Sequence, residues 1–187
     1  MPTFKVVIVG DVCTGKTCLL KRYINDTFDK GEGNTLGSQL YSKKLTARFM
    51  PKADKANEDA KSQRSTVSSS KQLEGMITED IKLQLWDTAG EERFRSLTPM
   101  YYKDAQAVLL VFALNSQESF ENLQGWIREI DLNCQTSNYI LALVGTKLDL
   151  DDQKEVAFKQ GQQHAKSNNA IYFETSAKEG TNIKEMF

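Results

Sequence analysis

Eight consecutive residues near the N-terminus have the types and the spacing of a phosphate-binding loop. Residues 10–17 read Gly-Asp-Val-Cys-Thr-Gly-Lys-Thr and fit the pattern G-x-x-x-x-G-K-[ST]. The two glycines allow a tight turn in which successive backbone N–H groups face one concavity and bind phosphate oxygens. Lys16 is expected to reach the β- and γ-phosphates, and the hydroxyl of Thr17 to ligate Mg²⁺. This segment therefore predicts a site for a nucleoside triphosphate.

The flanking residues predict the strand and the helix that such a loop requires. Residues 4–9 are a β-branched apolar run, which is typical of a buried parallel strand. Residues 18–24 carry apolar side chains at helical spacing, and the N-terminus of this helix adds a partial positive charge beside the loop. The residues expected to contact the nucleotide here are Asp11, Val12, Cys13, Thr14, Gly15, Lys16, Thr17 and Cys18.

Length, charge and cysteine content narrow the class of protein. A chain of 187 residues is long enough for one domain with a substantial core, so we expect a single domain over residues 1–187. The net charge of −1 gives no indication of nucleic acid or of a membrane surface as a partner. No apolar run approaches 18 residues, and the chain begins with a predicted strand rather than a signal peptide. Three irregularly spaced cysteines favour reduced cytosolic thiols over disulfides or a metal site.

Further strands and helices alternate along the chain. Strands are predicted at residues 38–49, 81–86, 107–114, 139–145 and 170–174, and helices at 116–134 and 155–168. Leu40, Leu45 and Phe49 are candidate core residues, and Ser116 is a candidate helix cap. The alternation predicts an α/β fold with a doubly wound, mostly parallel six-stranded sheet flanked by helices. In this architecture ligands bind at the carboxyl ends of the strands, where residues 10–17 fall.

Two segments differ from this alternation. Residues 50–76 are almost entirely polar, so they are expected to form a flexible insertion between the second and third strands. Residues 181–187 begin an amphipathic helix that would be only marginally stable at this length. We therefore expect the sequence to be a truncated piece of a longer protein in which this C-terminal helix continues.

Residues that follow the later strands are suited to bind a metal ion and to select a base. Asp87 is placed to hold Mg²⁺, and the backbone N–H of Gly90 to reach a γ-phosphate oxygen. Asp149 is placed to accept hydrogen bonds from the N1–H and the exocyclic amine of guanine, groups that adenine does not offer. Each residue alone has an ordinary structural explanation, such as a turn. Their occurrence together, in order and after the right strands, favours a guanine nucleotide.

Several other residues complete this predicted site. The stem of Lys147 is expected to pack along the guanine ring, and the backbone N–H of Ala177 to meet the guanine O6. Phe28 is expected to lie edge-on to the base, and Thr35 to ligate Mg²⁺ when a γ-phosphate is present. The remaining residues expected to bind the nucleotide are Thr146, Ser176 and Lys178.

These motifs resemble the small GTPases of the Ras superfamily over essentially the whole chain except the insertion. Residues 82–94 and 101–105 resemble the Rab branch, and residues 96–102 and 106–107 are similar to its early-endosome members. Residues 10–20 and 145–150 look more like the Rho branch, but the helical insertion of Rho proteins is missing, so the Rab branch is favoured. The resemblance implies a switch that binds GTP or GDP with Mg²⁺ and recruits effectors in vesicle traffic.

The resemblance also implies partners, a location and catalytic residues. Effectors, nucleotide-exchange factors and GTPase-activating proteins would bind the switch regions at residues 35–40 and 87–102. The protein would be a cytoplasmic monomer with no nucleic-acid partner. It would reach the cytosolic face of endosomal or vesicle membranes only through a lipidated C-terminal region beyond Phe187. The residues implied in hydrolysis are Lys16, Thr35, Gly90 and Glu91.

Three residues that bear on nucleotide binding and hydrolysis depart from the family pattern, and residues 38–40 depart from the Rab pattern in the strand that faces effectors. Thr146 replaces the usual Asn but retains a hydrogen-bonding group. Glu91 replaces the Gln that orients the attacking water, and Val12 replaces a small residue next to the γ-phosphate. Both of the latter changes predict slow hydrolysis. A scaffold that holds GTP or GDP almost permanently is therefore one alternative, and a phosphate-loop ATPase or small-molecule kinase, disfavoured by Asp149 and residues 176–178, is another.

Overall fold

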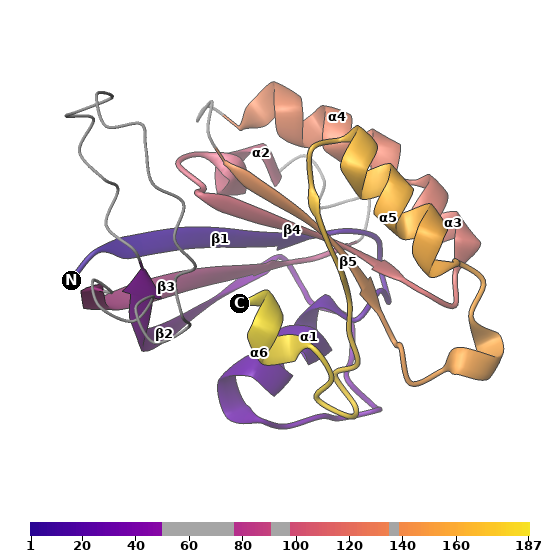
Figure 1. Cartoon of the computed structure of the whole chain (residues 1–187), viewed down its shortest axis with the longest axis horizontal. Helices are drawn as coiled ribbons and strands as arrows, with labels where there is room; N and C mark the ends of the chain where they lie inside the picture. The colour runs from indigo at the N-terminus through magenta and orange to yellow at the C-terminus, as the bar shows by residue number, and fades with distance from the viewer. Residues whose placement is uncertain (50–76, 91–97, 135–138) are drawn as a thin grey trace, which may run out of the picture.

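Strand β1 (Thr3–Val9) lies inside a six-stranded sheet whose strand order is β2-β3-β1-β4-β5-β6 (Figure 1). The computed structural model describes residues 1–49, 77–90, 98–134 and 139–187. The β2–β3 pair is antiparallel, and the other strand pairs of the described sheet are parallel. This confirms the predicted doubly wound, mostly parallel α/β sheet. The remaining strands are β2 (Ser38–Phe49), β3 (Ile77–Thr88), β4 (Ala107–Ala113), β5 (Ile140–Thr146) and β6 (Ile171–Glu174).

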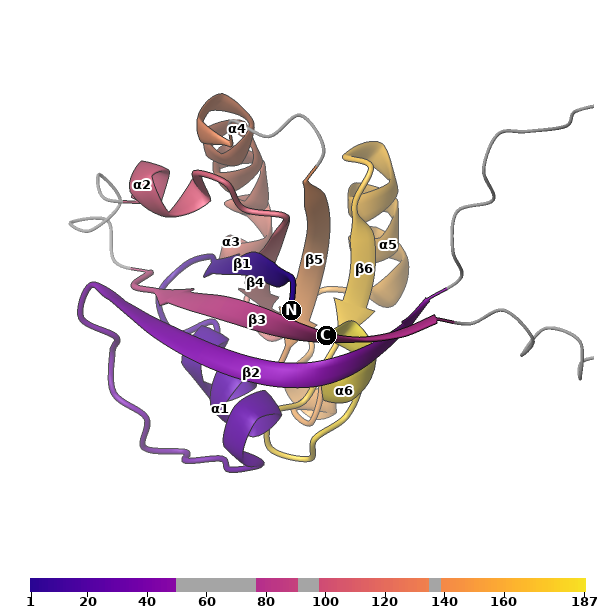
Figure 2. The same ribbon diagram turned by 90° about the vertical axis from the view of Figure 1, so that its left-hand side faces the viewer.

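Helices cover both faces of the sheet (Figure 2). One face carries α1 (Lys16–Asn25) and α6 (Ile183–Met186). The opposite face carries α2 (Thr98–Tyr102), α3 (Gln117–Glu121), α4 (Leu123–Asn133) and α5 (Phe158–Ser167). A 3-10 turn, η2 (Asp151–Gln153), follows β5. Among the helices of the described ranges, none is long and apolar enough to cross a bilayer.

Alternate residues of the central strands build two hydrophobic cores, one on each face. In β4, Val108 and Leu110 pack into the core beneath α4, whereas Leu109 and Val111 pack into the core beneath α1. Because both faces are covered, the strand must be apolar at every position. This is why residues 107–114 are a continuous apolar run in the sequence, and it fixes the carboxyl ends of β1, β4 and β5 beside one another.

The prediction that Leu40 belongs to the core is wrong. Leu40 is 50% exposed, whereas Leu45 packs against the core beneath α1. Successive side chains of a strand point to opposite faces, so two residues separated by five positions cannot share a face. The side chain of Phe49, the third candidate, lies outside the described residues.

The helix predicted at residues 116–134 is also corrected, because it forms two helices. Asn122 ends α3 and precedes α4. The predicted cap of α3 is confirmed, since the hydroxyl oxygen of Ser116 accepts a hydrogen bond from the backbone N–H of Ser119 at 3.2 Å. The cap of α3 could therefore be predicted from the residue type of Ser116, whereas the break between α3 and α4 at Asn122 could not.

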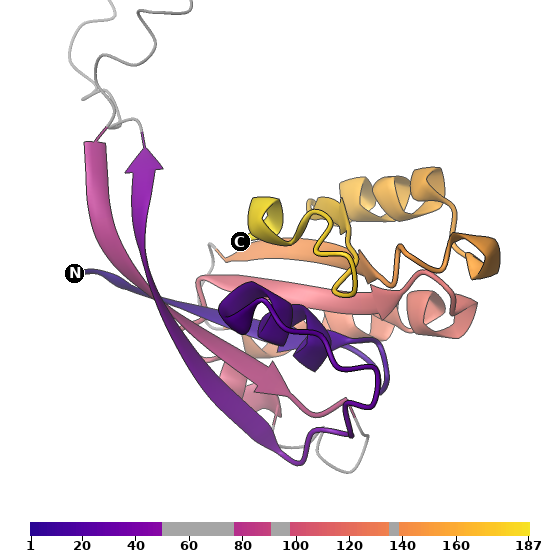
Figure 3. The same cartoon turned by 90° about the horizontal axis from the view of Figure 1, so that it is seen from below.

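Strands β2 and β3 form a long antiparallel ribbon. Their pairing runs from Ser38 opposite Thr88 to Phe49 opposite Ile77, and the far end of the ribbon extends past the helices (Figure 3). Strand β3 begins at Ile77, earlier than the predicted start at residue 81, because its distal half pairs only with β2. The predicted insertion at 50–76 and the predicted catalytic residue Glu91 lie outside the described residues.

Candidate nucleotide-binding site

A pocket of about 560 Å³ lies at the carboxyl ends of the parallel strands, where the sequence predicts the nucleotide. Residues from widely separated segments meet in it. The predicted site residues that line it are Val12, Cys13, Gly15, Lys16, Thr17, Cys18, Phe28, Thr35, Gly90, Thr146, Lys147, Asp149, Ala177 and Lys178. The predicted site residues that lie outside its lining are Asp11, Thr14, Asp87 and Ser176.

The phosphate loop leads from β1 into α1 through two glycines with positive φ. Gly10 has φ 138°, and a Cβ there would lie 2.0 Å from the carbonyl oxygen of Val111, so only glycine fits. Gly15 has φ 89° and is the N-cap of α1. No side chain caps this helix end, and its first turn contains no acidic residue. Its N–H groups are therefore available to an anion, as the motif predicts.

Lys16 is held across the loop by main-chain oxygens. Its ammonium donates hydrogen bonds to the carbonyl of Gly10 at 2.8 Å and to that of Asp11 at 2.6 Å. The side chain is buried, and this burial lowers the pKa of Lys16 to about 8, although the nearby carboxylates of Asp87 and Asp11 oppose the shift. A buried ammonium that, among the described residues, is held only by main-chain carbonyls and a hydroxyl, with no carboxylate bonded to it, is well placed to bind phosphate groups.

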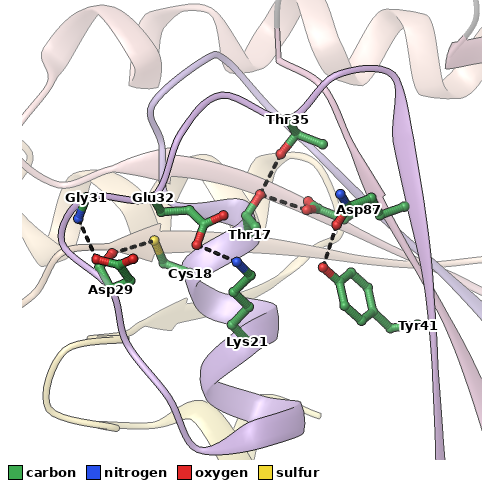
Figure 4. Close-up of polar contacts among 10 residues, drawn as sticks. Thr17, Cys18, Lys21, Asp29, Gly31, Glu32, Thr35, Tyr41 and Asp87 are labelled. Carbon is green, nitrogen blue, oxygen red and sulfur yellow. Dashed lines mark hydrogen bonds and ion pairs between the residues drawn. The ribbon is translucent and has the colours of Figure 1, made fainter.

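Thr17, Thr35 and Asp87, the three residues predicted to hold Mg²⁺, lie together beside the loop (Figure 4). The hydroxyl of Thr17 donates to Asp87 Oδ2 at 2.7 Å, and the hydroxyl of Thr35 lies 2.7 Å from that of Thr17. Asp87 is fully buried, and its Oδ1 has no hydrogen-bond partner among the described residues. Burial accordingly raises the pKa of Asp87.

This set of oxygens fits Mg²⁺. The ion prefers oxygen ligands and is usually held by one or two protein groups together with water and substrate phosphates. In the described ranges no cluster of three or more His, Cys, Asp or Glu residues could form an all-protein metal cage. Asp87 has a buried carboxylate oxygen without a hydrogen-bond partner among the described residues, and two hydroxyl groups lie beside it. This is consistent with a Mg²⁺ site, in which the protein supplies only a few of the ligands.

The other end of the pocket carries the residues predicted to select the base. Asp149 Oδ1 accepts a hydrogen bond from the hydroxyl of Ser176 at 2.7 Å, and Lys178 Nζ lies 3.9 Å from Oδ2. The carboxylate is therefore oriented by the last motif of the chain, at residues 174–178. Lys147 adopts φ 62°, a left-handed conformation in the loop that leaves β5. Phe28 lines the same pocket and is 37% exposed.

Arg22 of α1, which the sequence analysis missed, binds the main chain of this last motif. Its Nε donates to the carbonyl oxygen of Ala177 at 2.6 Å, and another guanidinium nitrogen donates to that of Lys178 at 2.9 Å. These two hydrogen bonds fix the main chain of Ala177 and Lys178, both of which line the pocket, against α1. No motif identifies Arg22, because its partners lie more than 150 positions away.

An ion pair also missed by the sequence analysis ties the loop after α1 to the helix (Figure 4). Lys21 Nζ lies 2.5 Å from Glu32 Oε2, and Asp29 accepts the N–H of Gly31 at 2.8 Å. Asp29 and Glu32 line the pocket together with Lys30, Gly33, Asn34, Thr88 and Leu150, none of which was predicted to do so. The contacts of this loop are set by tertiary structure rather than by a local pattern.

Gly90 and Val12 lie against each other at the mouth of the loop. A Cβ on Gly90 would lie 2.4 Å from the backbone nitrogen of Val12 and 2.6 Å from the carbonyl oxygen of Asp11. The side chain of Val12 is 43% exposed and lines the pocket. The approach of these two segments explains why a glycine follows β3 at this position.

The fold and this arrangement define a class of protein, the phosphate-loop α/β nucleotide-binding domains. A model of the Ras family matches residues 5–187. The Ras-related protein Rab-30 of Homo sapiens is 35% identical over 184 residues, covering 98% of this chain and 76% of its own. The Ras-related protein RABF2b of Arabidopsis thaliana is 35% identical over 183 residues, with the same coverage, and RABF2a is 34% identical.

The chain therefore belongs to the Ras family of small GTPases and lies in its Rab branch. Proteins of this family bind GTP and GDP, typically with Mg²⁺, and hydrolyse GTP. Its Rab branch acts in vesicle transport.

Proposed function

We propose that this protein is a Rab-like GTP/GDP switch whose nucleotide lies in the pocket described above and whose intrinsic hydrolysis is slow. One observation carries the proposal. The pocket gathers the phosphate loop, Thr35 and Gly90, and the base-selecting residues Asp149 and Ala177, which are far apart in sequence. We also propose that residues 1–187 form one domain that works as a monomer, with the segment 50–76 as a flexible insertion between the second and third strands.

One end of the pocket would bind the phosphates and Mg²⁺, and the other end would bind the guanine base. Lys16 and the uncapped N-terminus of α1 would bind the phosphates, and Thr17, Thr35 and Asp87 would hold Mg²⁺. The metal ion would supply neutralisation of phosphate charge. Asp149 would accept hydrogen bonds from guanine, and a base lacking those donors would leave the carboxylate without these two hydrogen bonds in a site that is largely closed to water.

Slow hydrolysis is supported by the position of Val12. Val12 lines the pocket and its backbone lies against Gly90, so its branched side chain would occupy space that an attacking water or an incoming arginine needs. Such an arginine contributes roughly 10³–10⁵ in rate in this class of enzyme. Glu91, which follows Gly90, would add like-charge repulsion to the γ-phosphate and has no amide N–H to offer.

Partner binding would use the switch regions at residues 35–40 and 87–102. Large apolar side chains are exposed there, with Leu36 at 72%, Leu40 at 50% and Met100 at 73%. Exposed apolar groups beside a ligand-dependent loop are suited to effectors, exchange factors and activating proteins. We propose a cytosolic location, with attachment to endosomal or vesicle membranes through a region that follows Phe187.

Competition for labelled GDP tests the nucleotide specificity. Unlabelled GDP and GTP should displace it, whereas ATP at a hundredfold excess should not. Asp149→Ala should weaken GDP binding roughly 100-fold or more, because two hydrogen bonds to a charged group are lost. The matched control, Asp152→Ala, removes an exposed carboxylate of η2 and should leave binding unchanged. Competition by ATP equal to that by GTP would instead favour a phosphate-loop ATPase or kinase.

A further inference from the structure

The structure assigns to Asn122 and Trp126 of α4 a role as positioning residues for the phosphate loop, exerted through Asp11. This inference rests on the proposed nucleotide site. Both oxygens of the Asp11 carboxylate accept hydrogen bonds from these residues. Oδ1 accepts one from the indole N–H of Trp126 at 2.7 Å, and Oδ2 accepts one from the amide N–H of Asn122 at 2.8 Å. The donors lie four residues apart, on one face of the helix start.

The same residue holds the lysine of the loop. The main-chain carbonyl of Asp11 accepts a hydrogen bond from Lys16 Nζ at 2.6 Å and another from the hydroxyl of Thr14 at 2.9 Å. Asp11 therefore connects two parts of the structure: its side chain is bound by α4, and its main-chain carbonyl is bound by the ammonium of Lys16. A rotation of the residue away from α4 would move the carbonyl that anchors Lys16.

The arrangement also accounts for an acidic residue inside a loop that binds phosphates. The carboxylate of Asp11 lies outside the pocket lining and is turned toward α4. Two donors stabilise its charge there, at a distance from the phosphates that it would repel. Freed from them, the carboxylate would be able to swing toward the pocket, which adds repulsion to the loss of the Lys16 anchor.

One donor is buried and the other is exposed, so each can be removed by a different kind of substitution. Trp126 is 3% exposed, and Trp126→Phe removes the indole N–H while keeping an aromatic ring in the core. Asn122 is exposed, so Asn122→Ala removes the second donor without touching the core. The control is Trp86→Phe, because the indole nitrogen of Trp86 has no hydrogen-bond partner in the part of the chain that the structure describes.

The test is the dissociation rate of labelled GDP in the presence of Mg²⁺. Trp126→Phe and Asn122→Ala should each raise it roughly 10- to 100-fold, the range expected for losing a hydrogen bond to a charged acceptor. Trp86→Phe should change it less than about twofold. In an Asp11→Ala background, Trp126→Phe should add no further increase, whereas a role in packing alone would leave its effect undiminished.

The outcomes separate this inference from the proposed function. Wild-type protein that binds GDP, together with rates for both Trp126→Phe and Asn122→Ala within twofold of wild type, would overturn the inference and leave the function standing. Equal effects of Trp126→Phe with and without Asp11 would also overturn it. Wild-type protein that binds no guanine nucleotide would overturn both. If Trp126→Phe does not fold, Asn122→Ala and its cycle with Asp11→Ala decide the result.

Discussion

The hydroxyl of Thr146 lies within hydrogen-bonding distance of the main-chain carbonyl of Thr14. This contact joins the base-selecting segment after β5 to the phosphate loop after β1. A second carbonyl, that of Phe112 at the end of β4, lies 3.0 Å from the same hydroxyl, and the side chain is buried. Threonine at a position where the family usually has asparagine therefore still connects the two halves of the site.

The first prediction concerns this contact. Thr146→Val keeps the shape of the side chain but removes the one hydroxyl proton that can be donated to either carbonyl, which leaves a buried carbonyl oxygen without its donor at a cost of about 1–3 kcal/mol. GDP should then dissociate roughly 5- to 50-fold faster, as measured by release of a fluorescent analogue. Thr146→Ser is the matched control, because it keeps the hydroxyl and should stay within a few-fold of wild type. Equal rates for the valine and serine variants would contradict this role.

The second prediction concerns the ion pair between Lys21 and Glu32. Its side chains are 34% and 21% exposed, so its contribution is limited to at most about 1 kcal/mol. Glu32→Gln should speed GDP release by at most about fivefold, and the effect should shrink at high salt because ions screen the pair. The charge-swapped double variant Lys21→Glu with Glu32→Lys should recover most of the loss. Swapped and single variants that release GDP equally fast would show that the pair does not hold the loop.

The third prediction follows from the lowered pKa of Lys16, which burial brings to about 8. Bound phosphates favour the charged ammonium and would raise this pKa again. The complex therefore holds more protons than the free protein near pH 8, so GDP affinity should fall as the pH rises through 8. Calorimetry in two buffers of different ionisation enthalpy should detect uptake of about half a proton per GDP at pH 8 and about a tenth at pH 7.

The control for that measurement is Lys16→Arg. A guanidinium stays charged throughout this range, so any GDP binding that this variant retains should show no proton uptake at pH 8. Wild-type binding without proton uptake at pH 8 would mean that Lys16 is already fully charged in the free protein.

Local signals in the sequence were sufficient for the sheet and for most of the pocket. The loop at residues 10–17 and the apolar run of β4 have meanings that do not depend on distant residues, and fold rules bring the strand ends together. Asp149 could be assigned to the site because it follows a recognisable strand, and Thr35 because it lies in the loop after the first helix; both line the pocket, while their binding roles stay predictions.

The features that escaped prediction depend on tertiary contacts. Arg22 and Trp126 lie in ordinary helical patterns, and the partners that connect them to the site, Ala177 and Asp11, lie more than 100 positions away. The exposure of Leu40 depends on which face of β2 the core covers, a choice that a twelve-residue strand with polar residues on both faces leaves open. Glu32 pairs with Lys21 only because the loop after α1 folds back along that helix.

The last prediction concerns turnover. Val12 lines the pocket, its backbone lies against Gly90, and Glu91 stands where the family has the water-orienting Gln. Under the proposed function, both residues should slow the chemical step rather than nucleotide binding. Val12→Gly and Glu91→Gln should each raise the hydrolysis rate roughly tenfold, and GDP affinity should change by less than about threefold. Asp152→Ala again serves as the unaffected control.

Single-turnover GTP hydrolysis, with GTP preloaded on the protein, tests the central claim most directly. The account predicts that the wild-type protein binds GTP tightly, hydrolyses it slowly, and is accelerated by Val12→Gly, by Glu91→Gln and most of all by both together. Fast hydrolysis by the wild-type protein, or no acceleration in any of the three variants, would contradict it.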